Sequence, residues 1–237
     1  VLIFTKQKVR IKTKGFHLEW KIFREIIIIG LPSLVMNALG GFMVVFSNIF
    51  LAAYSMTAVA FFGMYFKIQQ LITMTVNGLI QGCMPVMAYN YGAHNKSRLM
   101  ETFKMGLSIA VIMMGVGTMI LWIFPENALS LFRASDEMIK FGVPALRIMS
   151  SSFILAAFGF MFASFFQATG RVHYSMIINL LRQLVLLIPF MWLLSSIMGI
   201  SGIWWSFLVA ELITTIVCIV LFIRNDIRGP GMRFEEE

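Results

Sequence analysis

The sequence predicts an all-α membrane protein with six transmembrane helices. Of its 237 residues, 59% are hydrophobic and only 13% are charged, whereas soluble domains carry roughly 25% charged residues. The mean hydropathy is +0.85. Long uncharged runs alternate with short basic segments, while a soluble amphipathic helix shows a charged residue in nearly every turn. This alternation is typical of a bundle of membrane-spanning helices.

Six apolar runs are long enough to cross a bilayer. A helix needs about 20 residues, at a rise of 1.5 Å each, to cross a hydrocarbon layer of about 30 Å. The predicted spans cover about residues 26–54, 58–89, 105–124, 141–167, 174–197 and 203–223, and together form one six-helix region, 26–223. Because six is an even number, both ends of this region lie on the same side of the membrane.

The distribution of basic residues predicts which side that is. Most of the 19 Lys and Arg lie in residues 1–25, in the connector between the second and third spans, and in residues 224–237. Basic loops stay in the cytoplasm, so we expect both termini to be cytoplasmic and membrane lipid to surround the spans. The formal net charge of +8 then reflects membrane topology, and we expect no nucleic-acid partner.

Residues 1–25 carry seven Lys and Arg before the first apolar run. A signal peptide would place its apolar core directly after a short basic start. The segment, which begins at Val1, is instead typical of a loop between helices. We therefore expect it to be a cytoplasmic loop that follows an earlier helix, and the chain to be a fragment of a longer protein.

The residue types used by enzymes and metal sites are scattered. Cys83 and Cys218 lie in apolar runs at no metal-ligand spacing, and His17, His94 and His173 lie in or beside loops, far apart in sequence. Such isolated side chains are usually buried hydrophobes or solvated groups. The motifs of ATP-binding loops, nucleophile elbows and zinc helices are absent from the sequence. We predict no catalytic residues, no metal site and no cofactor.

Charged residues inside the spans are the strongest candidates for function. Lys67 and Glu211 each lie roughly 12–14 Å from the outer ends of their helices, and Arg182 lies about 12 Å from the inner end of its own. Glu211 is the only acid inside a predicted span, and an unpaired carboxylate there costs several kcal/mol or takes up a proton. We predict a charge network of Lys67, Arg182 and Glu211, in which Glu211 is either a structural ion-pair partner or the carboxylate that carries a coupling ion.

Three segments resemble the multidrug and toxic compound extrusion (MATE) family, and particularly its MepA-like bacterial branch. The first is QGCMPVMAYNYGAHNKSRLMETFKMG, at residues 81–106. The second is FFQATGRVHYSMIINLLRQLVLLIPFMWLL, at residues 165–194, and the third is GISGIWWSFLVAEL, at residues 199–212. They resemble, in order, the loop after helix eight, the turn between helices ten and eleven, and the start of helix twelve.

The resemblance implies that the chain is the C-terminal six-helix lobe of a twelve-helix MATE-type antiporter in a bacterial inner membrane. Its partner would be the N-terminal lobe of the same transporter. Such proteins export cationic or amphipathic compounds in exchange for H+ or Na+ by alternating access. Coupling carboxylates that some members place on helices seven and ten have no counterpart here, which implies that the coupling acid lies in the N-terminal lobe.

A cavity for varied flat cations needs adaptable, aromatic and polar walls, and the chain offers 19 Met and 23 Phe. Polar side chains inside spans are more selective markers, because each needs a partner or water. We predict that Asn37, Gln70 and Asn179 line the cavity.

Two other functions fit the same pattern of spans. One is a lipid-linked oligosaccharide flippase of the same superfamily, which would need a strongly basic cavity for pyrophosphate. Only Lys67, Arg147 and Arg182 are available for that. The other is a channel or assembly subunit that acts as a homodimer of six-helix units.

Overall fold

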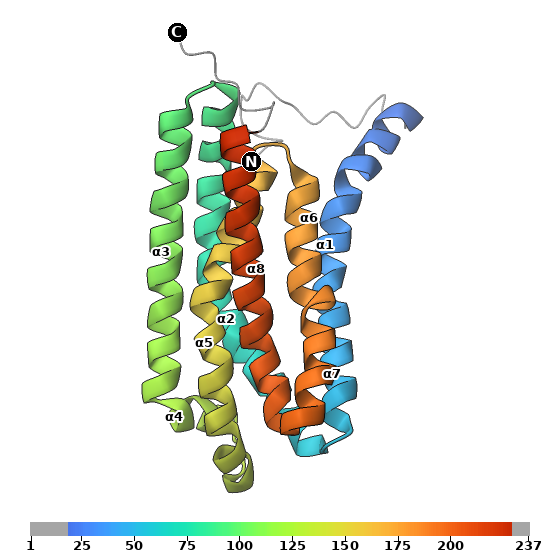
Figure 1. Cartoon of the computed structure of the whole chain (residues 1–237), viewed down its shortest axis with the longest axis vertical. Coiled ribbons are helices and arrows are strands. Elements are labelled where there is room, and N and C mark those ends of the chain that lie inside the picture. Colours follow the sequence, from blue (N-terminus) through green and yellow to red (C-terminus); the bar gives the residue numbers. More distant parts are fainter. Residues whose placement is uncertain (1–18, 229–237) are drawn as a thin grey trace, which may run out of the picture. The chain divides into compact units, whose positions relative to one another are not determined.

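The computed structural model describes residues 19–228, in which every regular element is helical (Figure 1). The elements are α1 (Trp20–Ala52), α2 (Met56–Gly92), α3 (Lys96–Ile123), α4 (Pro125–Ser130), α5 (Asp136–Ala168), α6 (Val172–Leu180), the π-helix η1 (Leu181–Val185), α7 (Leu187–Met198) and α8 (Ile200–Arg228). Six stretches of this helical structure are long and apolar enough to cross a membrane. The predicted fold class and number of spans are confirmed. The packing described below is that of the compact unit Met36–Glu237.

Several helices begin earlier than their apolar runs. Helix α1 starts at Trp20, so the prediction of loop through residue 25 is wrong from that point, and α8 continues to Arg228, past the predicted end at 223. Helix α3 starts at Lys96 instead of 105, because the Asn95 side chain accepts a hydrogen bond from the backbone N–H of Arg98, at 3.0 Å. Hydropathy detects only the part of a helix that lies in lipid, so it misses charged first turns.

The fifth predicted span, residues 174–197, is interrupted. It comprises α6, the π-helix η1 and α7, with a backbone hydrogen bond from Leu186 N–H to the Leu181 carbonyl, at 2.8 Å, that spans five residues. Pro189 follows this segment and has no N–H to donate to the carbonyl of Val185, four residues earlier. The extra residue of a π-helix accommodates this loss, and such segments are frequent at functional sites.

Helix α5 is the centre of the bundle. It packs against α2, α3, α6 and α8, and most residues of its apolar stretch are buried, whereas few of those in α2 are. Small side chains allow helices to approach closely in a membrane. Those buried on α5 include Ala145, Ser150, Ser152, Ala156, Ala157, Ala163, Ser164 and Ala168.

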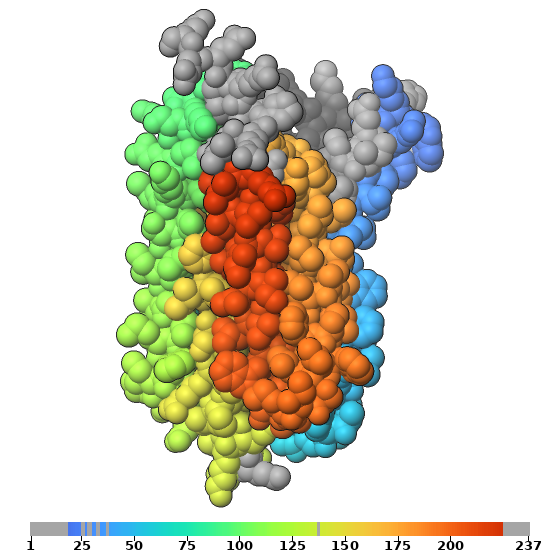
Figure 2. Space-filling view, viewed as in Figure 1, coloured from blue at the N-terminus to red at the C-terminus, as the bar shows by residue number. Residues whose placement is uncertain are grey.

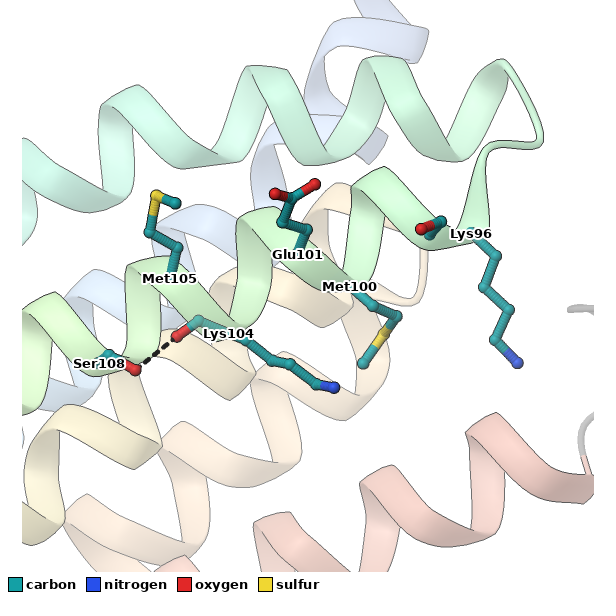
Figure 3. A pocket seen from close by; sticks show the side chains of 7 residues that line it. Lys96, Met100, Glu101, Lys104, Met105 and Ser108 are labelled. Carbon is teal, nitrogen blue, oxygen red and sulfur yellow. Dashed lines mark hydrogen bonds between the residues drawn. The ribbon is translucent and has the colours of Figure 1, made fainter.

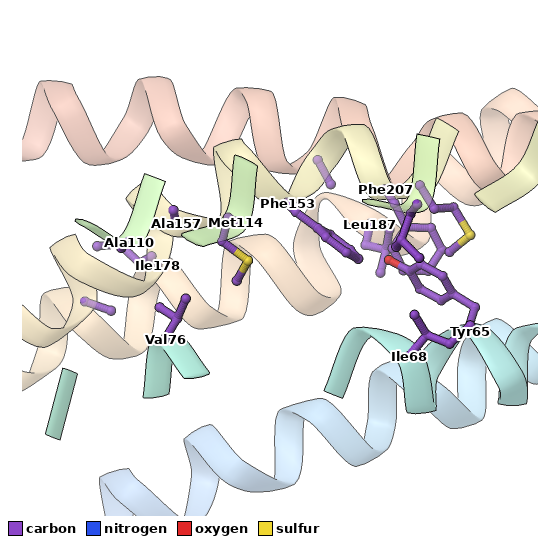
Figure 4. Packing of buried hydrophobic residues seen from close by; sticks show 14 of the residues in the cluster. Tyr65, Ile68, Val76, Ala110, Met114, Phe153, Ala157, Ile178, Leu187 and Phe207 are labelled. Atoms are coloured by element: carbon purple, nitrogen blue, oxygen red, sulfur yellow. The ribbon is translucent and has the colours of Figure 1, made fainter. Parts of the chain in front are cut away.

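Aromatic rings fill the spaces between these helices. Phe103 of α3, Phe162 and Phe165 of α5 and Phe222 of α8 form one cluster, with ring centroids 5.0–5.2 Å apart between helices. A second apolar region, which includes Tyr65, Phe153 and Phe207, joins α2, α5 and α8 (Figure 4). The described cores of α2, α3, α5 and α8 are therefore continuous.

The outward faces of α3 and α8 are apolar. Figure 2 shows α8 between α3 and α5 on one side and α6 and α7 on the other. The large exposed hydrophobic residues of these two helices are Met105, Ile109, Ile112, Val116, Met119, Ile120, Trp122 and Ile123 of α3, and Trp205, Leu212, Ile216, Ile219, Val220 and Ile223 of α8. Lipid tails are the solvent that suits such faces.

The start of α8 passes so close to the backbone of α7 that only glycine fits at position 202. A Cβ at Gly202 would overlap the backbone carbonyl of Leu194, which cannot rotate away. We expect Gly202→Ala to destabilise the fold by about 1–3 kcal/mol or more, as overpacking does, and thermal unfolding in detergent measures the loss. Gly115→Ala is the matched control, because a Cβ there meets nothing within 4 Å and alanine favours the helix. Equal unfolding temperatures for the two variants would contradict the close approach.

Candidate functional site

Helix α2 carries polar side chains along the face opposite its packed side. Its buried residues include Phe61, Tyr65, Ile68 and Val76, which contact the bundle. Residues at intervals of three and four on the other face are exposed. These residues, called the polar stripe below, are Gly63, Lys67, Gln70, Met74, Asn77 and Gln81.

The polar stripe does not suit lipid. Three side-chain amides and one ammonium group share one helix face, whereas the exposed residues of α3 from Met105 onward and of α8 from Trp205 to Ile223 are almost wholly hydrophobic. On insertion scales a lysine at the centre of a spanning helix costs about 2.5–3.5 kcal/mol. The polar stripe therefore requires water, a ligand or another polypeptide in front of it.

A buried ion pair joins η1 to α8. The Nε of Arg182, in η1, is 2.9 Å from Oε1 of Glu211, in α8, and the two side chains are 12% and 13% exposed. The guanidinium carbon of Arg182 also lies 4.1 Å from the centre of the Phe160 ring, a cation–π contact. Gly159 leaves room for this arginine, since a Cβ there would come within 3.3 Å of Nη1.

One carboxylate oxygen of the ion pair has no hydrogen-bond partner among the described residues. Oε2 of Glu211 and the hydroxyl of Tyr65 are both buried and unpartnered in the part of the chain that the structure describes. The pair nevertheless brings together α5, η1 and α8 through one carboxylate, one guanidinium and one aromatic ring. Such an arrangement holds helices in a fixed register, because breaking it exposes a charge to a medium without water.

The structure separates the predicted charge network. Arg182 and Glu211 form the pair, but Lys67 is exposed on the polar stripe and forms no ion pair with Glu211. The expectation that Lys67 reaches Glu211 came from equal depth in the membrane, which says nothing about the direction in which a side chain points. Lys67 points away from the helix bundle because Phe61, Tyr65 and Ile68 occupy the packed face of α2.

The three predicted cavity residues have different environments. Gln70 is exposed on the polar stripe. The Asn179 amide is half-buried and donates to the Ser175 carbonyl of its own helix, at 2.9 Å, and to the Met36 sulfur, at 3.7 Å. The side chain of Asn37 lies outside the described residues. The structure thus gives Asn179 partners within the lobe.

Comparison with known proteins decides the family. The MatE family profile matches residues 32–193, more than half of the chain. The chain belongs to the MatE family. It is 32% identical over 209 residues to the multidrug export protein MepA of Staphylococcus haemolyticus, and 30% identical over 206 residues to MepA of Staphylococcus aureus. These alignments cover 88% and 85% of this chain, but 45% and 44% of the relatives.

Solved structures of MatE family transporters share the fold. An outward-facing multidrug resistance MATE transporter aligns with a TM-score of 0.83 at 22% identity, over 96% of this chain and 51% of its own. A transporter of the MOP superfamily from Pyrococcus furiosus gives the same TM-score, identity and coverage. The chain therefore spans about half the length of the proteins it matches, and the predicted MATE-type lobe of six spans is confirmed as its fold.

The sequence contained a signal for the polar stripe that single residues did not reveal. Asn77 and Gln81 are polar and lie inside a predicted span. That they share a helix face with Gln70 and Lys67 becomes clear only when every polar residue at a spacing of three or four along α2 is considered together. Gln183 was missed as well. Its Oε1 would lie 3.3 Å from a Cβ at Gly40, so the π-helix also brings a polar group against α1.

A surface pocket on this MatE chain lies away from the polar stripe. It is lined by α3 residues Lys96, Ser97, Met100, Glu101, Lys104, Met105 and Ser108 (Figure 3). The hydrogen bond drawn there joins the Ser108 hydroxyl to the Lys104 carbonyl, at 2.9 Å, and is internal to the helix. The mixture of lysine and methionine is typical of a helix that passes from headgroups into lipid.

Proposed function

We propose that this chain is the C-terminal lobe of a secondary-active multidrug efflux antiporter, which exports cationic or amphipathic compounds in exchange for H+ or Na+ by alternating access. The polar stripe on α2 is the observation that carries the proposal, because it needs a wet space within a membrane protein. A second six-helix lobe placed against this face would enclose such a space. The relatives are named multidrug export proteins, which supports the same cargo here.

The proposed orientation keeps both termini in the cytoplasm of a bacterial cell. The basic first turns of α3, with Lys96, Arg98 and Lys104, would then lie at the inner surface. The coupling acid would belong to the N-terminal lobe, since within the described spans the carboxylate of Glu211 is held by Arg182. The lobe itself then needs no cofactor.

Transport of a dye tests this proposal. We expect inverted membrane vesicles that contain the complete transporter to accumulate ethidium when an H+ or Na+ gradient is imposed, and to do so without ATP. Dissipating the gradient with an ionophore should stop uptake. Vesicles without the transporter are the control. Uptake that requires ATP, or none under either gradient, would refute a secondary antiporter.

A further inference from the structure

Lys67 is the one charged member of the polar stripe. It lies three turns into α2, roughly 16 Å from the start of the helix at 1.5 Å per residue, and so well inside the span. Its side chain is exposed, and no described acid forms an ion pair with it. Glu211, the acid at comparable depth, is paired with Arg182. The ammonium group therefore has no anionic partner among the described residues, and it is accessible to an anionic group from outside them.

The surroundings of Lys67 have the composition of a small-molecule site. Gly63, one turn earlier, leaves open space, because a Cβ there would meet nothing within 4 Å. Gln70, one turn later, offers an exposed amide. Leu71 and Met74 are 67% and 70% exposed. A cation, an amide and an adaptable apolar surface thus lie side by side along about three turns of helix.

We propose that Lys67 binds the carboxylate of amphipathic cargo, so that the transporter accepts lipophilic molecules that carry an acidic group. This inference rests on the proposed function. The ammonium group donates a charge-assisted hydrogen bond to the carboxylate, which is stronger than a neutral one and gains further where water is excluded. Gln70 donates a second hydrogen bond, and Leu71 and Met74 contact the apolar body.

A small molecule fits this region better than an acid on a neighbouring helix. Helices that pack tightly in membranes meet through small residues. Here Lys67, Leu71 and Met74 present long, exposed side chains. These side chains keep another helix at a distance and leave room over Gly63. A flat amphipathic molecule fills such a space with its rings against Met74 and its carboxylate at Lys67.

Two dyes that differ in one group test the inference. Rhodamine 110 has a free carboxylate, and rhodamine 123 is its methyl ester with the same ring system. Efflux of each is measured in cells that produce the complete transporter as wild type, Lys67→Gln, Lys67→Met or Lys67→Arg, at matched membrane abundance. Lys140→Gln is the control, because Lys140 is an exposed lysine on α5, outside the polar stripe.

We expect Lys67→Gln and Lys67→Met to reduce rhodamine 110 efflux roughly tenfold, as loss of a charged hydrogen bond predicts, and to leave rhodamine 123 efflux within about twofold. Lys67→Arg should retain rhodamine 110 efflux, and Lys140→Gln should export both dyes normally. Equal loss of both dyes would assign Lys67 to a protein carboxylate and overturn the inference, as would unchanged efflux or a wild type that exports only rhodamine 123. Export of neither rhodamine by the wild type would also overturn the inference, whereas the proposed function fails only if the wild type does not transport ethidium either.

Discussion

Replacing Arg182 with glutamine is expected to destabilise the lobe by about 3–5 kcal/mol, the usual result of removing one partner from a buried ion pair. The variant leaves the Glu211 carboxylate among α5, η1 and α8 without its counter-charge, and it removes the cation–π contact with Phe160. For a chain of this size the loss corresponds to a fall in unfolding temperature of roughly 6–20 °C. Thermal unfolding of the purified protein in detergent measures it.

The double variant Arg182→Gln/Glu211→Gln separates charge from packing. Two neutral amides of similar volume can hydrogen-bond to each other, so we expect the double variant to recover most of the stability lost in Arg182→Gln. Arg224→Gln is the matched control, since Arg224 is exposed on α8 and should shift unfolding by less than about 0.5 kcal/mol. A double variant as unstable as Arg182→Gln would show that the charges are not what holds these helices.

The same double variant distinguishes the two roles considered for Glu211. A structural ion pair predicts that a folded double variant exports dye with normal dependence on the ion gradient. A coupling carboxylate predicts folded protein whose dye transport no longer responds to H+ or Na+. We favour the structural role, because Oε1 of Glu211 lies 2.9 Å from Nε of Arg182 and the pair links η1 to α8 inside the bundle.

Hydropathy was sufficient to predict six spans because lipid imposes a minimum apolar length on every crossing helix. It could not place the helix starts at Trp20 and Lys96, since a polar helical turn outside the lipid carries no free-energy cost of burying polar groups in hydrocarbon. It also could not reveal η1, which depends on the missing N–H of Pro189 and on backbone hydrogen bonding. The hydropathy pattern therefore predicts the number of spans more accurately than it predicts the ends and the internal geometry of the helices.

Depth along each helix was a partial guide to the buried charges. Arg182 and Glu211 were expected within reach of each other, and they lie in one ion pair. Lys67 lies at a similar depth, but its side chain points away from the bundle, because the buried apolar residues of α2 fix which side of that helix faces the bundle. Assigning that side from sequence requires the 3–4 spacing of all the polar residues in the helix, including Asn77 and Gln81.

If the proposed function holds, converting the amides of the polar stripe to leucine in the complete transporter is expected to abolish most of its drug export without harming the fold. In the variant Gln70→Leu/Asn77→Leu/Gln81→Leu, three exposed hydrogen-bonding groups become apolar. Each intramolecular hydrogen bond contributes about 0.5–1.5 kcal/mol, so loss of three such interactions with cargo or cavity water should reduce export at least roughly tenfold. Leucine favours membrane insertion by about 0.3–0.6 kcal/mol per residue, and the protein should reach the membrane in normal amounts.

The control places three leucines on a lipid-facing helix instead. Ile112→Leu/Val116→Leu/Met119→Leu alters an exposed face of α3 that is already apolar, and it should leave ethidium efflux unchanged. Export by the two triple variants is compared at equal membrane abundance, and the unfolding temperature of each is measured to confirm that the fold is intact. If the polar stripe faced lipid, the leucines on α2 would be as harmless as those on α3. A selective loss of export in the α2 variant is therefore the result that places the translocation pathway along this face.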